Sequence, residues 1–141
     1  MVSCYTEYWG KLVKGIRKNE SKRSAEAFNS FLARLDKTYH EGLLSKSQID
    51  LYHEVRCGLA HSYLIEGKGN AVINTGFEGL HRIDFDNTTN QYIFWVRTYF
   101  DEFKNAVNNY IKGLETGKED LQKLEDSLNP PKAAAAAQPT S

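Results

Sequence analysis

Apolar side chains recur every three or four residues along much of the chain, a spacing that predicts amphipathic α-helices. The first predicted helix runs from about Cys4 to Arg17. The second begins at Ser21 or Ser24, either of which can cap it, and ends at Gly42. The apolar face of the second helix consists of Ala25, Phe28, Leu32, Leu35 and Tyr39, with Phe31 beside it.

The middle of the chain contains a third predicted helix and then a change of period. The helix begins at Ser45 or Ser47 and runs to about Ile65, where glycines interrupt the pattern. Beyond them, residues 71–73 are short and β-prone, and residues 82–86 alternate between polar and apolar. This part of the sequence predicts a small β-hairpin or an ordered loop.

The clearest helical repeat follows residues 86–90, which form a predicted turn and supply candidate N-caps. It predicts a fourth helix from about Gln91 to Leu114 and a short fifth helix from about Lys118 to Leu128. Aromatic residues in the fourth helix outnumber what one apolar face requires, which indicates that part of it packs against a partner. The surplus aromatics are Tyr92, Phe94, Trp95 and Tyr99. The apolar positions of the repeat are Ile93, Val96, Phe100, Phe103, Val107, Tyr110, Ile111 and Leu114.

These patterns predict an all-α fold, a bundle of four long helices plus a short fifth, with the hairpin or loop between the third and fourth. A length of 141 residues suits one domain, which we place at residues 1–128. Proline is absent before Pro130, so long uninterrupted helices are allowed up to that point. Residues 129–141 are of low complexity and are predicted to form a disordered tail.

The overall charge gives no case for a strongly basic nucleic-acid-binding surface, because Lys plus Arg and Asp plus Glu balance at 18 each. A basic run at residues 11–23 is interpreted as a solvated helix face followed by a turn. The 2 cysteines form no disulfide framework. Neither a signal peptide nor an apolar run of about 18 residues is present, so we expect a cytoplasmic protein without a membrane partner.

Residues 52–63 concentrate side chains that an apolar helix face does not need. Arg56 can hold a phosphate through two parallel hydrogen bonds and stabilise charge that develops on it. His61, with an ordinary pKa of about 6.5, can give or take a proton near neutral pH. Tyr63 can donate a hydrogen bond to a phosphate or order a subunit interface. The combination predicts a site for a phosphate ester that requires no metal.

Helix geometry separates two of these groups. On a straight helix, Arg56 and Tyr63 project within about 20° of each other, and Tyr52 lies one turn earlier on nearly the same face. His61 projects about 140° away from Arg56. A shared cleft therefore requires either a break near Gly58 or a second copy of the chain. We expect a homodimer with Tyr52, Arg56 and Tyr63 close to its two-fold axis.

The spacing Arg56-x4-His61-x-Tyr63 resembles the signature of HEPN domains, and the order of predicted helices resembles theirs over about residues 3–115. The resemblance implies a small helical domain that acts as a dimer, and many such domains are ribonucleases that use no metal or other cofactor. It implies catalytic roles for Arg56 and His61 and RNA as the substrate. The match is closer to a subgroup of toxins whose partner, a minimal nucleotidyltransferase antitoxin, adenylates the motif tyrosine, here Tyr63.

One position departs from the ribonuclease pattern. The residue after the motif arginine is commonly Asn, Asp or His, whereas this chain has Cys57. The substitution removes a strong hydrogen-bonding group, so the alternative function is a non-catalytic HEPN-like module for binding or protein interaction. Cys57 and Tyr52 are therefore assigned supporting roles only.

Two further interpretations of the same segment stay open. Arg56 can instead form an ion pair with a neighbouring carboxylate such as Glu54 or Asp50, while His61 and Tyr63 serve packing. Alternatively, the segment could hold a metal ion, because three candidate ligands follow one another at steps of four residues and a pair at that spacing can bind zinc. They are His53, Cys57 and His61. The first and third of them lie about 12 Å apart along a helix, too far to share one ion, and we predict no metal site.

Overall fold

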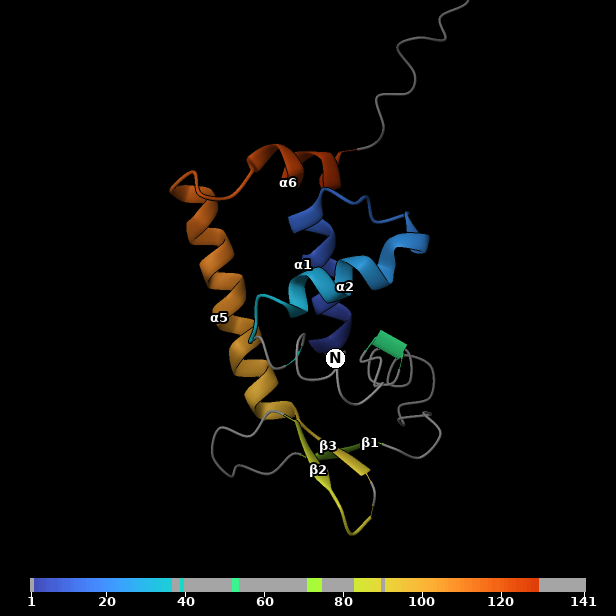
Figure 1. The fold of residues 1–141 in the computed structure, drawn as a ribbon. Coiled ribbons are helices and arrows are strands. Elements are labelled where there is room, and N and C mark those ends of the chain that lie inside the picture. Colours follow the sequence, from blue (N-terminus) through green and yellow to red (C-terminus); the bar gives the residue numbers. More distant parts are fainter. Residues whose placement is uncertain are drawn as a thin grey trace, which may run out of the picture.

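The computed structural model describes residues 2–36, 39, 52–53, 71–74, 83–89 and 91–129. This part of the chain is mainly helical, as predicted, and it also contains a three-stranded sheet at one end (Figure 1). The helices are α1 (Val2–Lys14), a 3-10 turn (Ser21–Arg23), α2 (Ser24–Leu32), α5 (Val96–Glu115) and α6 (Leu121–Leu128). The strands are β1 (Ala71–Asn74), β2 (Ile83–Asp86) and β3 (Gln91–Trp95).

α1 and α2 cross at close range because a glycine lies at their contact. A side-chain carbon at Gly10 would collide with the backbone carbonyl of Ala27, so the two helix backbones approach more closely there than side chains allow. α1 ends at Lys14, three residues before the predicted end, because Gly15 adopts the left-handed conformation, with φ of 70°. Ile16, just beyond, is fully buried.

α2 is shorter than predicted. It ends at Leu32, and turn-type hydrogen bonds follow, in which the amide of Arg34 donates to Phe31 and that of Leu35 donates to Leu32. The prediction that this helix continues to Gly42 is therefore wrong for residues 33–36. Its apolar positions were nevertheless identified correctly, because Phe28, Leu32 and Tyr39 are buried in one cluster with Leu35 against it.

The prediction of a helix from Gln91 is wrong for its first five residues, which form the strand β3. β3 is the central strand of the sheet, paired in parallel with β1 and antiparallel with β2. The two β-prone segments were located correctly, but each of them pairs with β3 and not with the other. Aromatic and β-branched side chains favour a strand where partners are available on both sides, and such residues fill most of β3.

The turn between β2 and β3 was predicted correctly, but it caps no helix. The carboxylate of Asp86 accepts hydrogen bonds from the amide of Thr88 at 2.8 Å and from the hydroxyl of Thr89 at 2.9 Å. These bonds fold the chain back, so that Ile83 lies opposite Phe94 across the antiparallel pair. β3 then continues directly into α5, whose N-cap position is Trp95.

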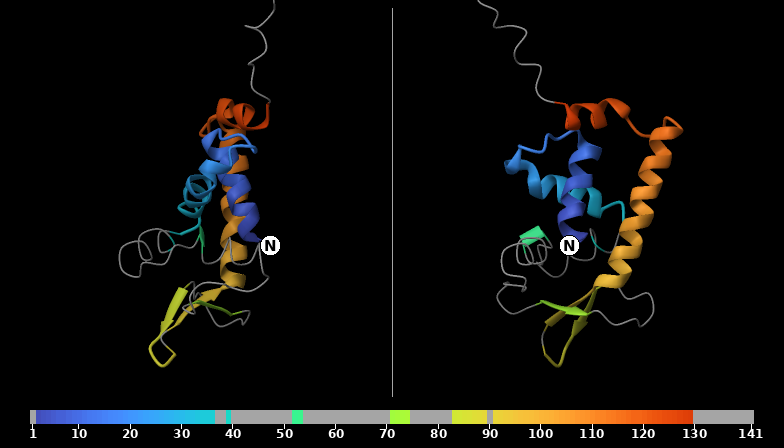
Figure 2. Two further views of the ribbon diagram at one scale, coloured as in Figure 1. Left: turned by 90° about the vertical axis from the view of Figure 1, so that its right-hand side faces the viewer. Right: turned by 180° about the vertical axis from the view of Figure 1, so that it is seen from behind.

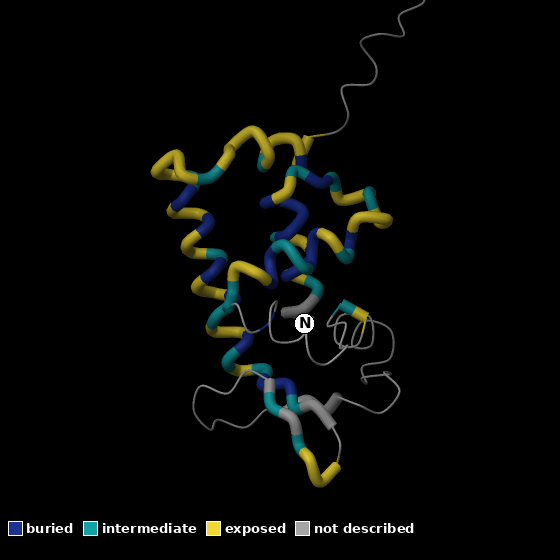
Figure 3. Tube along the Cα trace, in the orientation of Figure 1, coloured by how far each residue is buried: buried dark blue, intermediate teal, exposed yellow. Residues whose placement is uncertain are grey.

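α5 lies along one side of the α1–α2 pair and buries one face of aromatic and small residues (Figures 1 and 3). Phe103 contacts Phe31 of α2 with ring centroids 5.6 Å apart, and Tyr110 contacts Trp9 of α1 at 6.1 Å. The predicted apolar stripe was only partly right, because Phe100 and Ile111 are exposed. The buried residues of α5 are Tyr99, Phe103, Ala106, Tyr110 and Gly113.

α6 was predicted, although it begins at Leu121 and not at about Lys118, and it covers the C-terminal end of α1 (Figure 2). Its N-cap is Asp120, whose carboxylate accepts a hydrogen bond from the amide of Gln122 at 2.9 Å. Near its C-terminus, the buried hydroxyl of Ser127 donates to the carbonyl oxygen of Ile16 at 3.0 Å. The segment that follows α1 and the end of α6 are therefore joined at this side of the molecule.

Candidate functional site

The described part of the candidate segment consists of Tyr52 and His53. The half-buried ring of Tyr52 packs edge-on against Phe28 of α2, with ring centroids 5.7 Å apart. Phe28 is itself only 1% exposed, so Tyr52 rests on the core of its own chain. The start of the candidate segment is thus fixed against α2.

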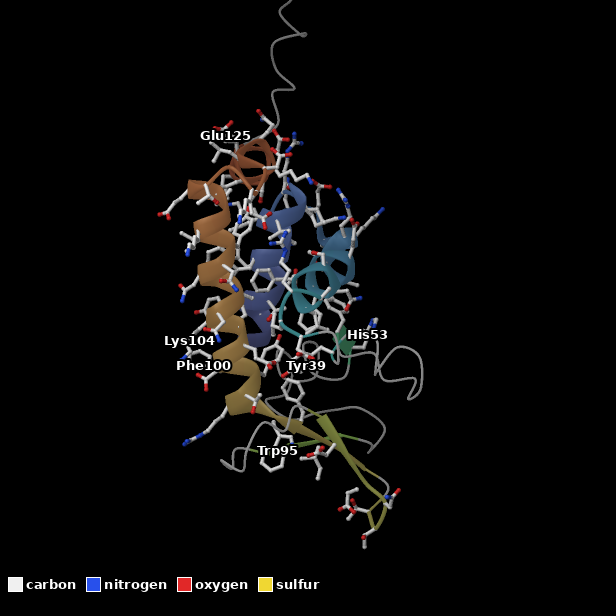
Figure 4. The ribbon with its side chains drawn as sticks, turned by 60° about the vertical axis from the view of Figure 1, so that its left-hand side comes forward. Tyr39, His53, Trp95, Phe100, Lys104 and Glu125 are labelled. Carbon is white, nitrogen blue, oxygen red and sulfur yellow. The ribbon has the colours of Figure 1, made fainter. Side chains whose placement is uncertain are left out.

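His53 is exposed, and its ring contacts the ring of Tyr52 edge-on at 5.2 Å. Figure 4 places it beside α2, on the side of the molecule opposite Phe100 and Lys104 of α5. The imidazole is therefore accessible to solvent next to the point where the candidate segment joins the core.

The residues that carry the motif, Arg56, Cys57, His61 and Tyr63, lie outside the described residues. Their predicted convergence in a cleft, and the placement of Tyr52 near a two-fold axis, remain predictions. The rest of the predicted third helix, the alternative zinc ligands Cys57 and His61, and the tail beyond Asn129 fall outside the described ranges as well.

A buried aromatic cluster lies under Tyr52 and joins the sheet to the helices. Tyr39 contacts Tyr99 at 5.6 Å between ring centroids, and Phe94 of β3 contacts Tyr99 at 5.1 Å. The hydroxyls of Tyr99 and Thr6 are hydrogen-bonded at 2.5 Å. Burial raises the pKa of the Tyr99 phenol well above its usual range, so it stays protonated at alkaline pH values where an exposed tyrosine ionises. The surplus aromatics assigned to a partner surface are in part this core, since Phe94, Trp95 and Tyr99 are all buried.

Many of the basic side chains between residues 11 and 23 have acidic partners within the chain. Lys11 is 8% exposed; its ammonium lies 3.3 Å from Glu7 and donates to the carbonyl of Lys18 at 3.1 Å. The expectation of a wholly solvated face is therefore wrong for Lys11, whose stem is enclosed between α1 and the following turn.

A second acidic residue neutralises the exposed end of the same run. The guanidinium of Arg23 donates two hydrogen bonds of 2.9 Å to the carboxylate of Glu26, which also lies 3.7 Å from Lys14. Hydrogen bonding to Arg23 lowers the pKa of Glu26, and the same contact raises the pKa of Arg23. These pairs reduce the positive charge that this surface presents to a polyanion.

A pocket of about 310 Å³ lies where α6 packs on α1, and no local sequence pattern indicates it because its walls are over 100 residues apart. It is lined by Tyr8, Lys11, Leu12, Lys18, Ser127 and Leu128. Within the described residues, no group of three or more His, Cys, Asp or Glu side chains is arranged to hold a metal ion. In the same part of the chain, no helix has the length and apolar character needed to cross a membrane.

No family model matches the chain, and neither the curated proteins nor the solved structures compared with it give a match. The motif at Arg56–Tyr63 and the helical frame around Tyr52 are therefore the basis for a functional assignment.

Proposed function

We propose that this chain is a HEPN-like, metal-independent endoribonuclease that cleaves RNA with Arg56 and His61, with Tyr63 in a supporting role. The observation that carries the proposal is the spacing Arg56-x4-His61-x-Tyr63. The fixed position of Tyr52 on α2 supports it, because a catalytic segment that begins on a rigid core can hold its groups in place.

The chemistry requires a group that accepts a proton and a cation that binds the phosphate, and it requires no metal. A ribose 2′-hydroxyl attacks the adjacent phosphorus while His61 accepts its proton, and the bond to the 5′-oxygen of the next nucleotide breaks as that oxygen is protonated. Arg56 binds the phosphate and stabilises the charge that builds up on its oxygens. The products are a 2′,3′-cyclic phosphate and a free 5′-hydroxyl.

The proposal includes a homodimer, since Arg56 and His61 diverge on one straight helix and a second copy can complete the cleft. Tyr52, Arg56 and Tyr63 are placed near its two-fold axis. Light scattering at tens of micromolar protein tests this part, and a mass that stays strictly monomeric would contradict it.

Cleavage of mixed RNA by the purified protein in the presence of EDTA tests the activity. Because general acid–base help is typically worth ~10²–10⁴-fold, His61→Ala is expected to abolish nearly all cleavage. Arg56→Ala should do the same and also weaken RNA binding. His53→Ala is the matched control, since it removes an exposed imidazole from the same segment and should leave the rate unchanged.

The outcomes separate the alternatives. Inhibition by EDTA together with loss of activity in His53→Ala would support a metal site in place of the proposed one. Equal cleavage by wild type and both motif variants would reject the nuclease. Binding of RNA or a protein without any cleavage would favour the non-catalytic module, which Cys57 suggests, and a gain of activity in Cys57→Asn would identify that residue as the cause.

We also propose that Tyr63 is the target of a nucleotidyltransferase antitoxin. Adenylation would place negative charge beside Arg56 and silence the site. Intact-mass measurement after co-expression with a neighbouring nucleotidyltransferase gene tests this: added mass is expected for the wild type and none for Tyr63→Phe. Added mass that persists in Tyr63→Phe would reject this target.

A further inference from the structure

The pocket between α1 and α6 combines polar and apolar groups that together suit a small amphiphilic ligand. Its volume of about 310 Å³ lies at the lower end of the range found for ligand sites. At about 30 Å³ for each water-sized group, it has room for roughly ten non-hydrogen atoms. We call it the α1–α6 pocket; it lies along the C-terminal half of α1, at the end of the molecule far from the sheet (Figures 1 and 2).

Lys11 supplies this pocket with a cation that is already held in place. The residue is buried, its ammonium lies 3.3 Å from the carboxylate of Glu7, and it donates to the carbonyl oxygen of Lys18 at 3.1 Å. An ammonium has three N–H donors, and these contacts within the described residues use two of them. The third donor is therefore available to an acceptor in the pocket, and the side chain loses little freedom when it binds one.

The charges of the lining favour an anion with a single negative charge. The described residues that line the pocket include two lysines, Lys11 and Lys18, and no acidic residue. Glu7 balances the charge of Lys11, and the exposed side chain of Lys18 adds one further positive charge. One carboxylate matches this excess, whereas a phosphate monoester, with a charge of about −1.5 to −2 at neutral pH, exceeds it.

The other lining groups are mostly apolar and partly open to water. Leu128 is 60% exposed and Tyr8 is 47% exposed, whereas Leu12 is buried. A hydrocarbon chain seated against them would remove apolar surface from water, which stabilises the bound state. The hydroxyl of Ser127 is already used as a donor to the carbonyl oxygen of Ile16. The ammonium of Lys11 is therefore the buried donor that can recognise the polar end of a ligand.

We propose that the α1–α6 pocket binds a medium-chain monocarboxylate, a molecule of about ten non-hydrogen atoms. Its carboxylate accepts a hydrogen bond from Lys11 and is attracted by Lys18, and its hydrocarbon chain covers Leu128 and the ring of Tyr8. The site is separate from the proposed nuclease. Figure 4 shows Glu125 of α6 and His53 at opposite ends of the helices.

Titration of the isotope-labelled full chain with octanoate, followed through the amide NMR signals, tests the proposal. The shifts are expected to saturate at millimolar octanoate, as suits so small a ligand, and to be largest at residues 8–18, 127 and 128. The uncharged control is 1-octanol, which has the same chain without the carboxylate. It should bind at least roughly 10-fold more weakly, because it lacks the charge-assisted hydrogen bond to Lys11.

Two exposed leucines of α6 provide a matched pair of variants. Leu128→Glu places a negative charge in the lining and should weaken octanoate binding by roughly 10-fold, because like charges repel. Leu121→Glu makes the same change at a residue that is 55% exposed and is not among the lining residues, and it should leave binding unchanged. Lys11→Met keeps the stem but removes the ammonium, so it should abolish the preference for octanoate over octanol. Circular dichroism checks that each variant is folded.

Three results would each overturn the proposal. Octanol that binds the wild type as tightly as octanoate would show that the pocket does not recognise charge. Equal weakening by Leu128→Glu and Leu121→Glu would show a general effect of added negative charge on the protein. Shifts that fail to saturate, or that are as large in α2 and α5 as in α1 and α6, would show that octanoate has no site in this pocket. The two leucine variants keep the test valid if Lys11→Met does not fold.

Discussion

The two faces of α5 use similar residues for different purposes. The inner face buries Tyr99, Phe103 and Tyr110 against α1 and α2, and it alternates these rings with Ala106 and Gly113. The outer face exposes Phe100 and Ile111 among charged side chains. Hydrophobicity alone does not distinguish the faces. What distinguishes them is that the inner face combines its rings with small residues, whereas the outer face surrounds its apolar residues with charged side chains that remain in water.

A substitution on the inner face should therefore change the stability of the monomer, whereas one on the outer face should change it little. The following predictions test this difference, beginning with the largest effect.

Phe103→Ala and Phe100→Ala form a matched pair on one helix. Phe103 is 8% exposed and packs on Phe31, so its removal leaves a cavity and should lower the free energy of unfolding by ~3–5 kcal/mol. Phe100→Ala removes a ring that is 44% exposed and should cost less than ~1 kcal/mol. Urea unfolding followed by circular dichroism measures both. Equal losses in the free energy of unfolding would show that the two faces contribute equally to the stability of the monomer.

Alkaline pH should act on the inner face through its buried tyrosines. Burial raises the pKa of Tyr99 and of Tyr110 above the ordinary value of 10. The unfolded phenols lose their protons near pH 10 while the folded ones keep them, so the free energy of unfolding falls as the pH rises above 10. The limiting slope is about 1.4 kcal/mol per pH unit for each tyrosine.

Tyr110→Phe should make this slope shallower, as measured by urea unfolding between pH 9 and 11. Tyr5→Phe is the matched control, since Tyr5 is 59% exposed on α1. A slope that is unaffected by Tyr110→Phe would contradict the assignment of Tyr110 to the titrating core.

Arg34 provides a smaller test, at the edge of the inner face. Its guanidinium lies 5.4 Å from the centre of the Tyr110 ring and donates two hydrogen bonds to Glu119, at 2.5 and 3.1 Å. The pair is less than one-third exposed, so Arg34→Ala should lower the free energy of unfolding by about 1–2 kcal/mol. Arg34→Lys keeps the charge but loses the paired geometry, and thermal unfolding should place it between wild type and Arg34→Ala. A lysine variant as unstable as the alanine variant would show that the paired hydrogen-bond geometry of Arg34, and not its charge, accounts for the whole loss of stability.

Lys104→Ala should have the smallest effect on the monomer. Its ion pair with Asp101 is about half exposed on both sides, and such pairs contribute at most about 1 kcal/mol. Thermal unfolding of the variant should give nearly the same melting temperature at low salt as at high salt. A loss as large as that of Arg34→Ala would show that the outer face also stabilises the monomer.

The sequence predicted the burial of apolar side chains better for α2 than for α5. Phe28, Leu32 and Tyr39 were assigned to the core correctly, although α2 itself ends at Leu32. For α5 the apolar stripe mixed its two faces, since Phe100 and Ile111 are as hydrophobic as the buried rings. The burial of Ala106 depends on which way Trp9 and Phe31 face, and no local pattern contains that information.

The period of apolar residues did not distinguish the strand β3 from the helix, although its residues favour a strand. The spacing of Ile93 and Val96 continues the period of α5, and the strand forms because β1 and β2 are present on either side. The candidate site shows the opposite limit. Residue types at Arg56 and His61 suggest a chemistry, whereas their meeting in one cleft requires a helix break or a second copy, which the sequence does not specify.

The contact at Gly10 limits which substitutions this position can tolerate. Its neighbour is the backbone of Ala27, which no substitution can remove, so a second mutation at position 27 cannot make room for a side chain at position 10. A saturation library would therefore be expected to retain only glycine at position 10, while position 100 accepts many residues. In a chain that has lost this glycine, α1 and α2 must lie farther apart where they cross. That change would also alter the packing beneath Phe28 and Tyr52.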